Sequence, residues 1–328
     1  MNKKRSLLKA LLVLIVLAVG FFWPLPVYIE TVGSAQNVAN YVTVAKKKDT
    51  SKGKLLLTYV KLAHATPFLY AASFFDKNAE RIPASQISGG NNDQKFDLIQ
   101  SYYMESAVNQ AKVSALKMSH HKFQQSFQGI YVLSVLAKST FKHQLKIGDL
   151  ITRVDGQKFD SQVELIKYLS HQKIKQRVKI SYLRNQKNRQ AVGKIIKITK
   201  KRNGIGVELA AKTAVKSDPP IKADMEGIGG PSAGLMLALQ MYSQLSGSNL
   251  KKGRIIAGTG TISTNGQVGE IGGIDKKVIA AKRAGATIFL SPTGSNYRLA
   301  QKTANKLNLK IKIIPVRTLK EAVKFLKQ

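Results

Sequence analysis

Gly230-Pro231-Ser232-Ala233-Gly234 is the most informative stretch of this chain, because together with Lys277, 45 residues after Ser232, it offers a nucleophile and a base. Its glycines let the backbone approach a substrate closely. The apolar run at residues 235–242 follows at once and is long enough for a buried helix. We therefore expect the Ser232 hydroxyl at a helix N-terminus, where backbone amides and the helix dipole stabilise an oxyanion. The amide of Ala233 is the candidate oxyanion donor. These residues together indicate a serine nucleophile.

A serine hydroxyl is a poor nucleophile unless a neighbouring base takes its proton, and Lys277 is the candidate base. We expect Asp275 to cap a helix over residues 275–284, so that Lys277 falls in the first turn, where the dipole disfavours a cation. Small alanines share the face of Lys277, whereas Lys276 shares its face with Arg283. Lowering a lysine pKa by about three units costs roughly 4 kcal/mol, which burial would supply.

Lys277 closes the motif Gly272-Gly273-Ile274-Asp275-Lys276-Lys277. This motif and the one around Ser232 resemble those of the Lon-type peptidases, which carry Gly-Gly-hydrophobic-x-x-Lys and Pro-Ser-Ala-Gly. The resemblance implies that Ser232 is the nucleophile and Lys277 the general base. Residues 257–262 are similar to the strand before the base motif, which makes Thr259 the residue expected to orient Lys277. No cofactor and no metal are implied.

A weaker similarity lies upstream, where residues 103–111 resemble the Met-x-Glu-Ser-Ala helix near the start of the Lon-type domain. If both similarities hold, the protease domain is split along the chain. Ile228-Gly229 stands where Lon proteases usually have Lys-Asp, so any regulatory role of that aspartate is absent. The sequence also has no Gly-x-x-x-x-Gly-Lys-Ser/Thr phosphate loop, so the ATP-driven unfoldase of Lon is missing.

The segment between the two halves resembles a PDZ domain of the bacterial protease type. Strands are expected at residues 129–135, 178–183 and 193–199, with a turn, strand and turn at 145–156 and a helix at 161–169. A peptide would add as a strand beside Ile130 to Val132. The alternative is a small domain used only for spacing. The expected groove residues are Gly129, Ile130, Tyr131, Val132, Leu165 and Leu169.

The N-terminus predicts a single membrane anchor. Residues 10–29 are uncharged, about the length that crosses roughly 30 Å of hydrocarbon, and Phe21, Phe22, Trp23 and Tyr28 suit an outer aromatic belt. The basic residues 3–5 place the tail in the cytoplasm and the remainder outside the cell. The prolines after Trp23 indicate that the helix ends before the apolar run does. A signal peptide cleaved before Ala35 is the alternative.

The net charge of the 328-residue chain is +35, and lysines are spread over every segment. Anionic lipids, wall polymers and acidic substrates are the natural counter-ions of such a chain outside a cell. No nucleic-acid motif accompanies the charge, so no specific nucleic acid is expected as a partner. The absence of cysteine excludes disulfides and thiolate catalysis, and no His-Glu-x-x-His pattern occurs among the five histidines.

The sequence therefore predicts an α+β fold: a Lon-type proteolytic domain with an inserted PDZ domain and one transmembrane helix. The expected activity is ATP-independent cleavage of extended or unfolded peptides at the outer membrane face by a Ser-Lys dyad. The alternatives are a catalytically silent PDZ adaptor and a cationic wall- or membrane-binding structural protein; homo-oligomerisation stays open. The expected boundaries are a cytoplasmic tail at 1–5, a transmembrane helix at 6–29, the two protease parts at 30–120 and 213–328, and the PDZ domain at 121–212.

In the protease part, strands are expected from the apolar runs and helices from their periodicity. Asn265-Gly266 suits a hairpin turn. The expected strands lie at residues 54–60, 254–261, 286–290 and 310–315, and the expected helices at 96–117, 232–245, 275–284 and 319–326.

Overall fold

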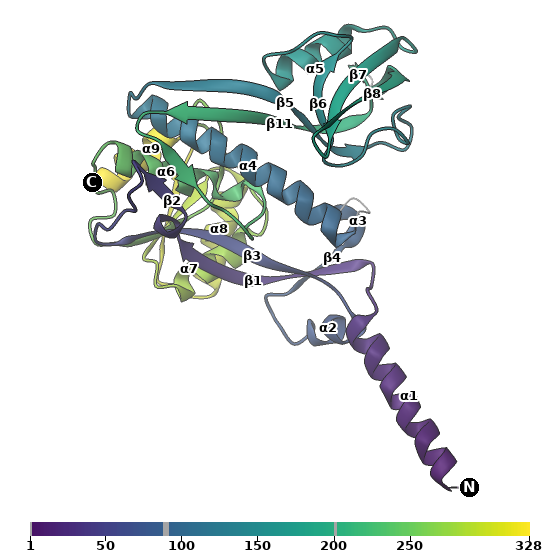
Figure 1. Cartoon of the computed structure of the whole chain (residues 1–328). Helices are drawn as coiled ribbons and strands as arrows, with labels where there is room; N and C mark the ends of the chain where they lie inside the picture. Colours follow the sequence, from purple (N-terminus) through teal and green to yellow (C-terminus); the bar gives the residue numbers. More distant parts are fainter. Residues whose placement is uncertain (1, 88–91, 200–201) are drawn as a thin grey trace.

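The computed structural model describes residues 2–87, 92–199 and 202–328 of the chain, so the predicted tail at 1–5 begins outside this part, at Met1. Figure 1 shows a long N-terminal helix that projects from the molecule, a mixed α/β body and a smaller, β-rich body. The long helix α4 (Asp93–Met118) lies between the two bodies.

Helix α1 (Asn2–Phe22) is the element expected to span the membrane. Its segment Lys4–Phe22 has a mean hydropathy of 2.2, and only 6% of its most apolar stretch is buried against the rest of the chain. By length and composition this helix is a candidate membrane span. A signal sequence near an N-terminus would have the same properties.

The expected span at 6–29 is too long at its C-terminal end. The helix ends at Phe22, because Pro24 and Pro26 follow and a proline cannot continue a helix. Tyr28 belongs to strand β1 and is only 3% exposed, so its assignment to an aromatic belt was wrong.

A six-stranded sheet forms the centre of the larger body, in the order β17-β16-β13-β3-β1-β4. Strands β3, β13, β16 and β17 run parallel, whereas β1 pairs antiparallel with both β3 and β4. The two ends of the chain thus build one sheet. The strands are β1 (Val27–Asn37), β3 (Lys54–His64), β4 (Glu80–Pro83), β13 (Ile255–Gly258), β16 (Ile288–Pro292) and β17 (Lys312–Val316).

Helices cover both faces of this sheet, and alternation along the strands assigns side chains to the two faces. Leu55 and Leu57 belong to the core formed with α4, α6 and α9, whereas Leu56 points to the core formed with α7 and α8. Such near-continuous apolar runs are typical of a strand buried on both faces. The helices are α6 (Gly234–Leu245), α7 (Ile274–Arg283), α8 (Ser295–Lys306) and α9 (Leu319–Lys327).

The smaller body contains a five-stranded sheet in the order β11-β5-β6-β7-β8. Helix α5 packs on this sheet, and together they enclose an apolar core separate from that of the larger body. The strand expected at 193–199 is broken into β8 and β9. The elements are β5 (Phe123–Val135), β6 (Leu150–Val154), α5 (Gln162–His171), β7 (Arg177–Arg184), β8 (Lys187–Lys194), β9 (Ile196–Thr199), β10 (Arg202–Gly204) and β11 (Val207–Ser217).

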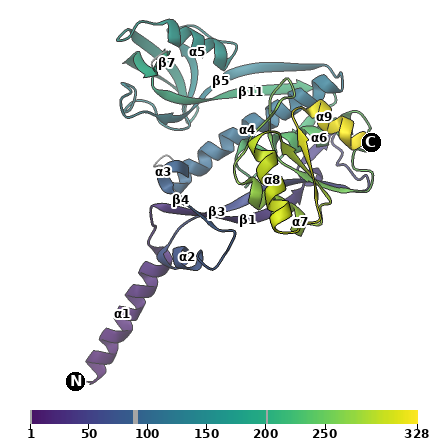
Figure 2. The same cartoon turned by 180° about the vertical axis from the view of Figure 1, so that it is seen from behind.

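Strands β5 and β11 form a long antiparallel ribbon that joins the two bodies (Figures 1 and 2). Helix α4 packs against the sheet of the smaller body, where Tyr102 stacks on Tyr131 with ring centroids 3.9 Å apart. Tyr103 donates a hydrogen bond of 2.9 Å to Glu208 on β11. These contacts hold the smaller body on the helix.

Short elements complete the described chain. The hairpin expected at Asn265-Gly266 is present between β14 and β15, and Gly266 has the positive φ of 82° that such turns need. The short elements are η1 (Val38–Asn40), β2 (Val42–Val44), α2 (Pro67–Ala72), α3 (Ala84–Ile87), β12 (Ile221–Ala223), η2 (Pro231–Ala233), β14 (Thr261–Ile262) and β15 (Val268–Gly269).

Candidate active site

Ser232 lies in the 3-10 turn η2, which leads directly into the buried helix α6. Gly230 before it has a φ of 83°, a conformation that suits glycine, and its amide donates to the Gln100 carbonyl of α4 at 3.0 Å. The Ser232 carbonyl accepts a bond of 2.8 Å from the Gly260 amide. The backbone around Ser232 is therefore held from both sides, by α4 and by the segment after β13.

Lys277 lies on helix α7, and its side chain extends to Ser232. Its Nζ donates to the Ser232 Oγ at 3.0 Å and lies 3.4 Å from the Thr259 Oγ1. Thr259 in turn donates to the Ser232 carbonyl at 3.1 Å. Three of the side chains singled out in the sequence thus meet in space, although 45 residues separate Ser232 from Lys277.

Burial lowers the pKa of Lys277 from an ordinary value of 10.5 to about 8, and the nearby Glu30 carboxylate partly opposes this effect. Only 4% of the Lys277 side chain is exposed. A charged amine loses its hydration at such a site, so the neutral form is favoured. At pH 7, about a tenth of Lys277 is therefore unprotonated and able to accept a proton, far more than for an ordinary lysine.

Helix α7 does not begin as expected. Gly273, not Asp275, occupies the N-cap position, with a left-handed φ of 64°. A Cβ atom at Gly273 would come within 2.6 Å of Val60 and 2.9 Å of Glu30. The glycine is needed because the start of α7 lies directly against β1 and β3, and this contact brings Lys277 close to the sheet.

Lys276 is buried as well, with 2% of its surface exposed, and it faces a cluster of carboxylates. Its Nζ lies 3.2 Å from Glu30, 2.8 Å from Glu80 and 3.3 Å from Asp275. Burial alone would lower the pKa of Lys276, but the ion pairs outweigh it and raise the pKa above its usual range. Two adjacent buried lysines therefore have opposite pKa shifts, and Lys276 is the one that stays charged.

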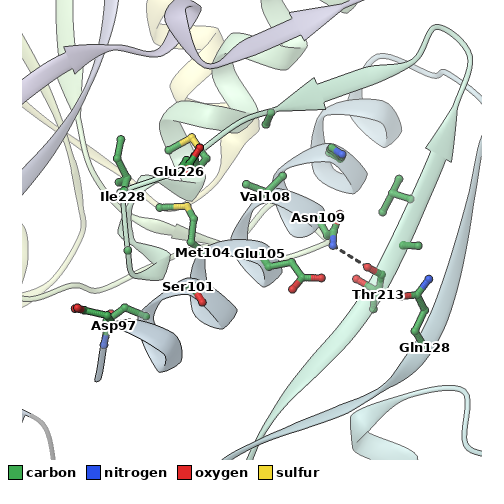
Figure 3. Close-up of a pocket in the computed structure, with 18 residues that line it drawn as sticks. Asp97, Ser101, Met104, Glu105, Val108, Asn109, Gln128, Thr213, Glu226 and Ile228 are labelled. Carbon is green, nitrogen blue, oxygen red and sulfur yellow. Dashed lines mark hydrogen bonds between the residues drawn. The ribbon is translucent and has the colours of Figure 1, made fainter. Parts of the chain in front are cut away.

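The loop at residues 226–229, which leads to Ser232, separates two cavities. One, of about 710 Å³, lies between this loop, the end of β3 and the start of α4; its lining includes Tyr59, Val60, Leu62 and Phe96. The other, of about 890 Å³, lies between the loop, α4 and β11, where Asn109 donates to the Thr213 carbonyl at 2.8 Å (Figure 3). The loop that leads to the nucleophile is thus flanked by a cavity on each side.

The peptide groove expected along Ile130 to Val132 is wrong, because β5 is an inner strand. Ile130 and Tyr131 pair with β11 on one side and with β6 on the other, so no edge is free for a peptide. Gly129 pairs with β11, and Val132 is fully buried. Neither backbone edge of this segment is open to an added strand.

The open groove lies instead between β11 and α5. A cavity of about 370 Å³ there is lined by Gly206, Val207 and Leu209 on one side and by Ile166 and Leu169 on the other. β11 is the edge strand of its sheet, so its outer edge is available. Leu165 and Leu169 are both 2% exposed and belong to the core of the smaller body, and of the two only Leu169 also lines this cavity.

Comparison with known protein families defines the class of this chain. Residues 184–327 match the model of the Lon protease (S16) C-terminal proteolytic domain, and residues 107–210 match the PDZ domain model. The chain combines a PDZ domain with a Lon-type proteolytic domain in a mixed α/β fold.

Individual relatives agree with this class. The chain is 36% identical over 96 residues to the Lon protease of Neorickettsia sennetsu, and 37% identical over 95 residues to that of Trichlorobacter lovleyi. Each match covers 29% of this chain and 11% of the relative. The chain therefore spans about a tenth of the length of these curated relatives.

A solved structure is similar to part of the chain. The PDZ domain of an SdrC-like protein from Listeria monocytogenes is 40% identical and covers 26% of this chain and 90% of that chain, with a TM-score of 0.25.

Sequence reasoning missed several residues that shape the site. The ion pair of Glu30 and Lys276 had no local sequence signal, because the two residues are far apart in the chain. Gln100 contacts the loop before the nucleophile only because α4 crosses it. The run Gly204-Ile205-Gly206-Val207 could have indicated the groove. Glycines beside a strand often mark a site where a ligand or another backbone comes close to the main chain.

Proposed function

We propose that this protein is a membrane-anchored serine endopeptidase that cleaves extended or unfolded peptides with Ser232 and Lys277, without ATP. The distance of 3.0 Å between the Lys277 Nζ and the Ser232 Oγ, inside a buried site, carries this proposal. A nucleophile and a base within hydrogen-bond reach are the geometric requirement for covalent catalysis. The Lon-type proteolytic domain supports the same conclusion.

In the proposed reaction, the Ser232 Oγ attacks the scissile carbonyl while Lys277 takes its proton. The C–N bond then breaks, and Lys277 returns the proton to the departing amine, leaving an ester on Ser232. Water, deprotonated by Lys277, hydrolyses that ester and restores the serine. A neutral lysine is needed at the first step, and burial supplies it.

The oxyanion formed in each addition step would be held by backbone amides at the start of α6. The Gly234 and Leu235 amides already donate to the carbonyls of Pro231 and Gly260. The Ala233 amide is therefore the proposed donor, as expected from the sequence. Thr259 would position the Lys277 amine against Ser232.

Cleavage of an unstructured protein tests this proposal. The purified full chain in lipid vesicles is incubated with an unfolded protein and with tagged peptides, without nucleotide, and products are identified by mass spectrometry. Internal cleavage is expected in the wild type. Intact substrate that is nevertheless retained would instead indicate a peptide-binding adaptor, and salt-sensitive adsorption alone would indicate a cationic structural protein.

The PDZ domain is proposed to hold the substrate by adding it as a strand to the outer edge of β11, beside α5. Replacing Ile166 by lysine would place a charge in this groove without opening the core. We expect peptide affinity to fall about tenfold, or roughly 1.4 kcal/mol, with cleavage of very short peptides unchanged. Val163→Lys is the matched control, since Val163 is on the same helix and 76% exposed. Equal losses in both variants, measured by fluorescence polarisation, would contradict the assignment.

We propose that α1 is retained as an anchor with the catalytic part outside the cell. Cleavage before Ala35 would cut through β1 and remove Glu30, which pairs with Lys276. It would also remove Tyr28, whose ring stacks on that of His64 at 4.6 Å. The folded body thus uses residues that a signal peptidase would discard. The basic residues before the apolar run favour a cytoplasmic N-terminus.

A further inference from the structure

Large apolar side chains are left exposed on α2 and on the turn after it. Phe74 is 62% and Phe75 is 90% exposed, and Phe68 and Leu69 on α2 are 38% and 36% exposed. We call these four residues the α2 patch. Phe68 and Leu69 are neighbours on α2, and Phe74 and Phe75 are neighbours in the turn after it. An exposed apolar cluster of this kind is costly in water and marks a surface that meets an apolar partner.

The α2 patch lies beside the end of α1. The rings of Phe21 and Phe68 make an edge contact with centroids 4.8 Å apart. A Cβ atom at Gly20 would overlap the Phe68 ring at 2.2 Å, so the two elements approach as closely as a glycine allows. Figures 1 and 2 show α2 on the side of the body from which α1 projects.

The fold holds the α2 patch in place. The Thr66 hydroxyl accepts a bond from the Leu69 amide at 3.3 Å and caps α2. The Arg81 guanidinium lies 3.8 Å above the Phe74 ring and donates to the Ser73 carbonyl at 3.2 Å. Arg81 belongs to β4 in the central sheet, so the Phe74 ring and the turn that carries it are anchored to the body of the protein.

We propose that the α2 patch lies in the outer interface of the same bilayer that α1 crosses, with Phe74 and Phe75 among the lipid chains. The inference depends on the anchoring role of α1 proposed above. A bilayer is the partner because the patch is continuous with the exposed aromatic end of α1, where Phe22 and Trp23 are 82% and 63% exposed. Aromatic rings concentrate at this depth of a membrane.

This second membrane contact would fix the orientation of the catalytic body relative to the bilayer. Leu62, Ala63 and His64 line the cavity of about 710 Å³ beside the loop at residues 226–229, and the chain leads from them into α2. A single helix would let the body tilt and rotate, whereas two contacts define its orientation. This cavity would thereby be held close to the membrane surface.

Tryptophan quenching by brominated lipids tests the proposal in the full chain. Trp23 is the only tryptophan, so Trp23→Phe provides a silent background. Phe75→Trp is introduced into the Trp23→Phe background, and the protein is reconstituted in vesicles of phosphatidylcholine and phosphatidylglycerol. We expect the fluorescence of the tryptophan at position 75 to be blue-shifted. Its intensity should fall when the lipids carry bromine near the headgroup end of their acyl chains.

Two further single-tryptophan variants separate the outcomes. Leu14→Trp lies within α1 and reports whether this helix is inserted in the bilayer. Leu307→Trp lies directly after α8, at a site 43% exposed, and reports non-specific adsorption of the protein to the vesicles. Quenching at positions 14 and 75 but not at 307 is the expected result. Quenching at 14 alone would overturn the proposal while leaving the anchor intact. Quenching at none of the three, or at all three, would also overturn it.

Discussion

Replacement of Ser232 by alanine is expected to abolish peptide cleavage, with a loss of about 10⁴-fold or more in kcat/KM. The Oγ of Ser232 forms the covalent bond in the proposed reaction, and the chain has no cysteine to take its place. Lys277→Met should cause a comparable loss, because the nucleophile then has no base at 3.0 Å. The double variant should lose little more than either single variant, since the two residues act as a unit.

Lys276→Met is the matched control for this experiment. Lys276 is the neighbouring residue, is equally buried and is also a lysine, but it binds carboxylates and not Ser232. This variant should retain measurable cleavage, although loss of its ion pairs will lower the melting temperature. Kinetics with a quenched fluorescent peptide and thermal unfolding of each variant separate the two effects. Near wild-type rates in Ser232→Ala or Lys277→Met would disprove the dyad.

The pH dependence of cleavage is expected to follow the ionisation of Lys277. The amine must be neutral to accept the proton, and its pKa is lowered to about 8 by burial. The rate constant kcat/KM should therefore rise with pH and level off above about 8, falling about tenfold for each unit below that value. Initial rates between pH 6 and pH 9.5 measure the midpoint. A flat profile over this range would contradict a lysine base.

Two variants change that midpoint in opposite directions without touching Ser232 or Lys277. Lys276→Met leaves the Glu30 carboxylate unpaired, and its negative charge then stabilises the Lys277 cation, so the midpoint should rise by about one unit or more. Glu30→Gln removes the charge that opposes the pKa shift, so the midpoint should fall. Combining both substitutions should cancel most of the rise. Unchanged midpoints would show that the carboxylate cluster only supports the fold.

These opposite shifts explain why the sequence Lys276-Lys277 is not redundant. One lysine is paired with carboxylates and stays charged, while the other is buried with a hydroxyl and tends to lose its proton. The charged lysine also limits how strongly Glu30 acts on its neighbour. The two lysines therefore differ because Glu30, Glu80 and Asp275 pair with Lys276, whereas the Lys277 amine contacts the Ser232 hydroxyl.

Local sequence patterns were enough to predict the elements that depend on neighbouring residues. The glycine turn before an apolar run places Ser232 at a helix start, the long uncharged N-terminus predicts α1, and apolar runs predict β3, β13, β16 and β17. Lys277 was also identified in this way, because its motif is contiguous. In each case the relevant interactions involve residues close together in the chain.

Which surfaces are open and which charges are paired depends on how the chain packs in three dimensions. β5 lies between β6 and the distant strand β11, whereas β11 is at the edge of the sheet, so the proposed peptide groove is near Val207 and not along Ile130. Lys276 is buried because β1 and β4 bring Glu30 and Glu80 to it. Burial and strand order depend on long-range packing, which local patterns of polarity do not encode.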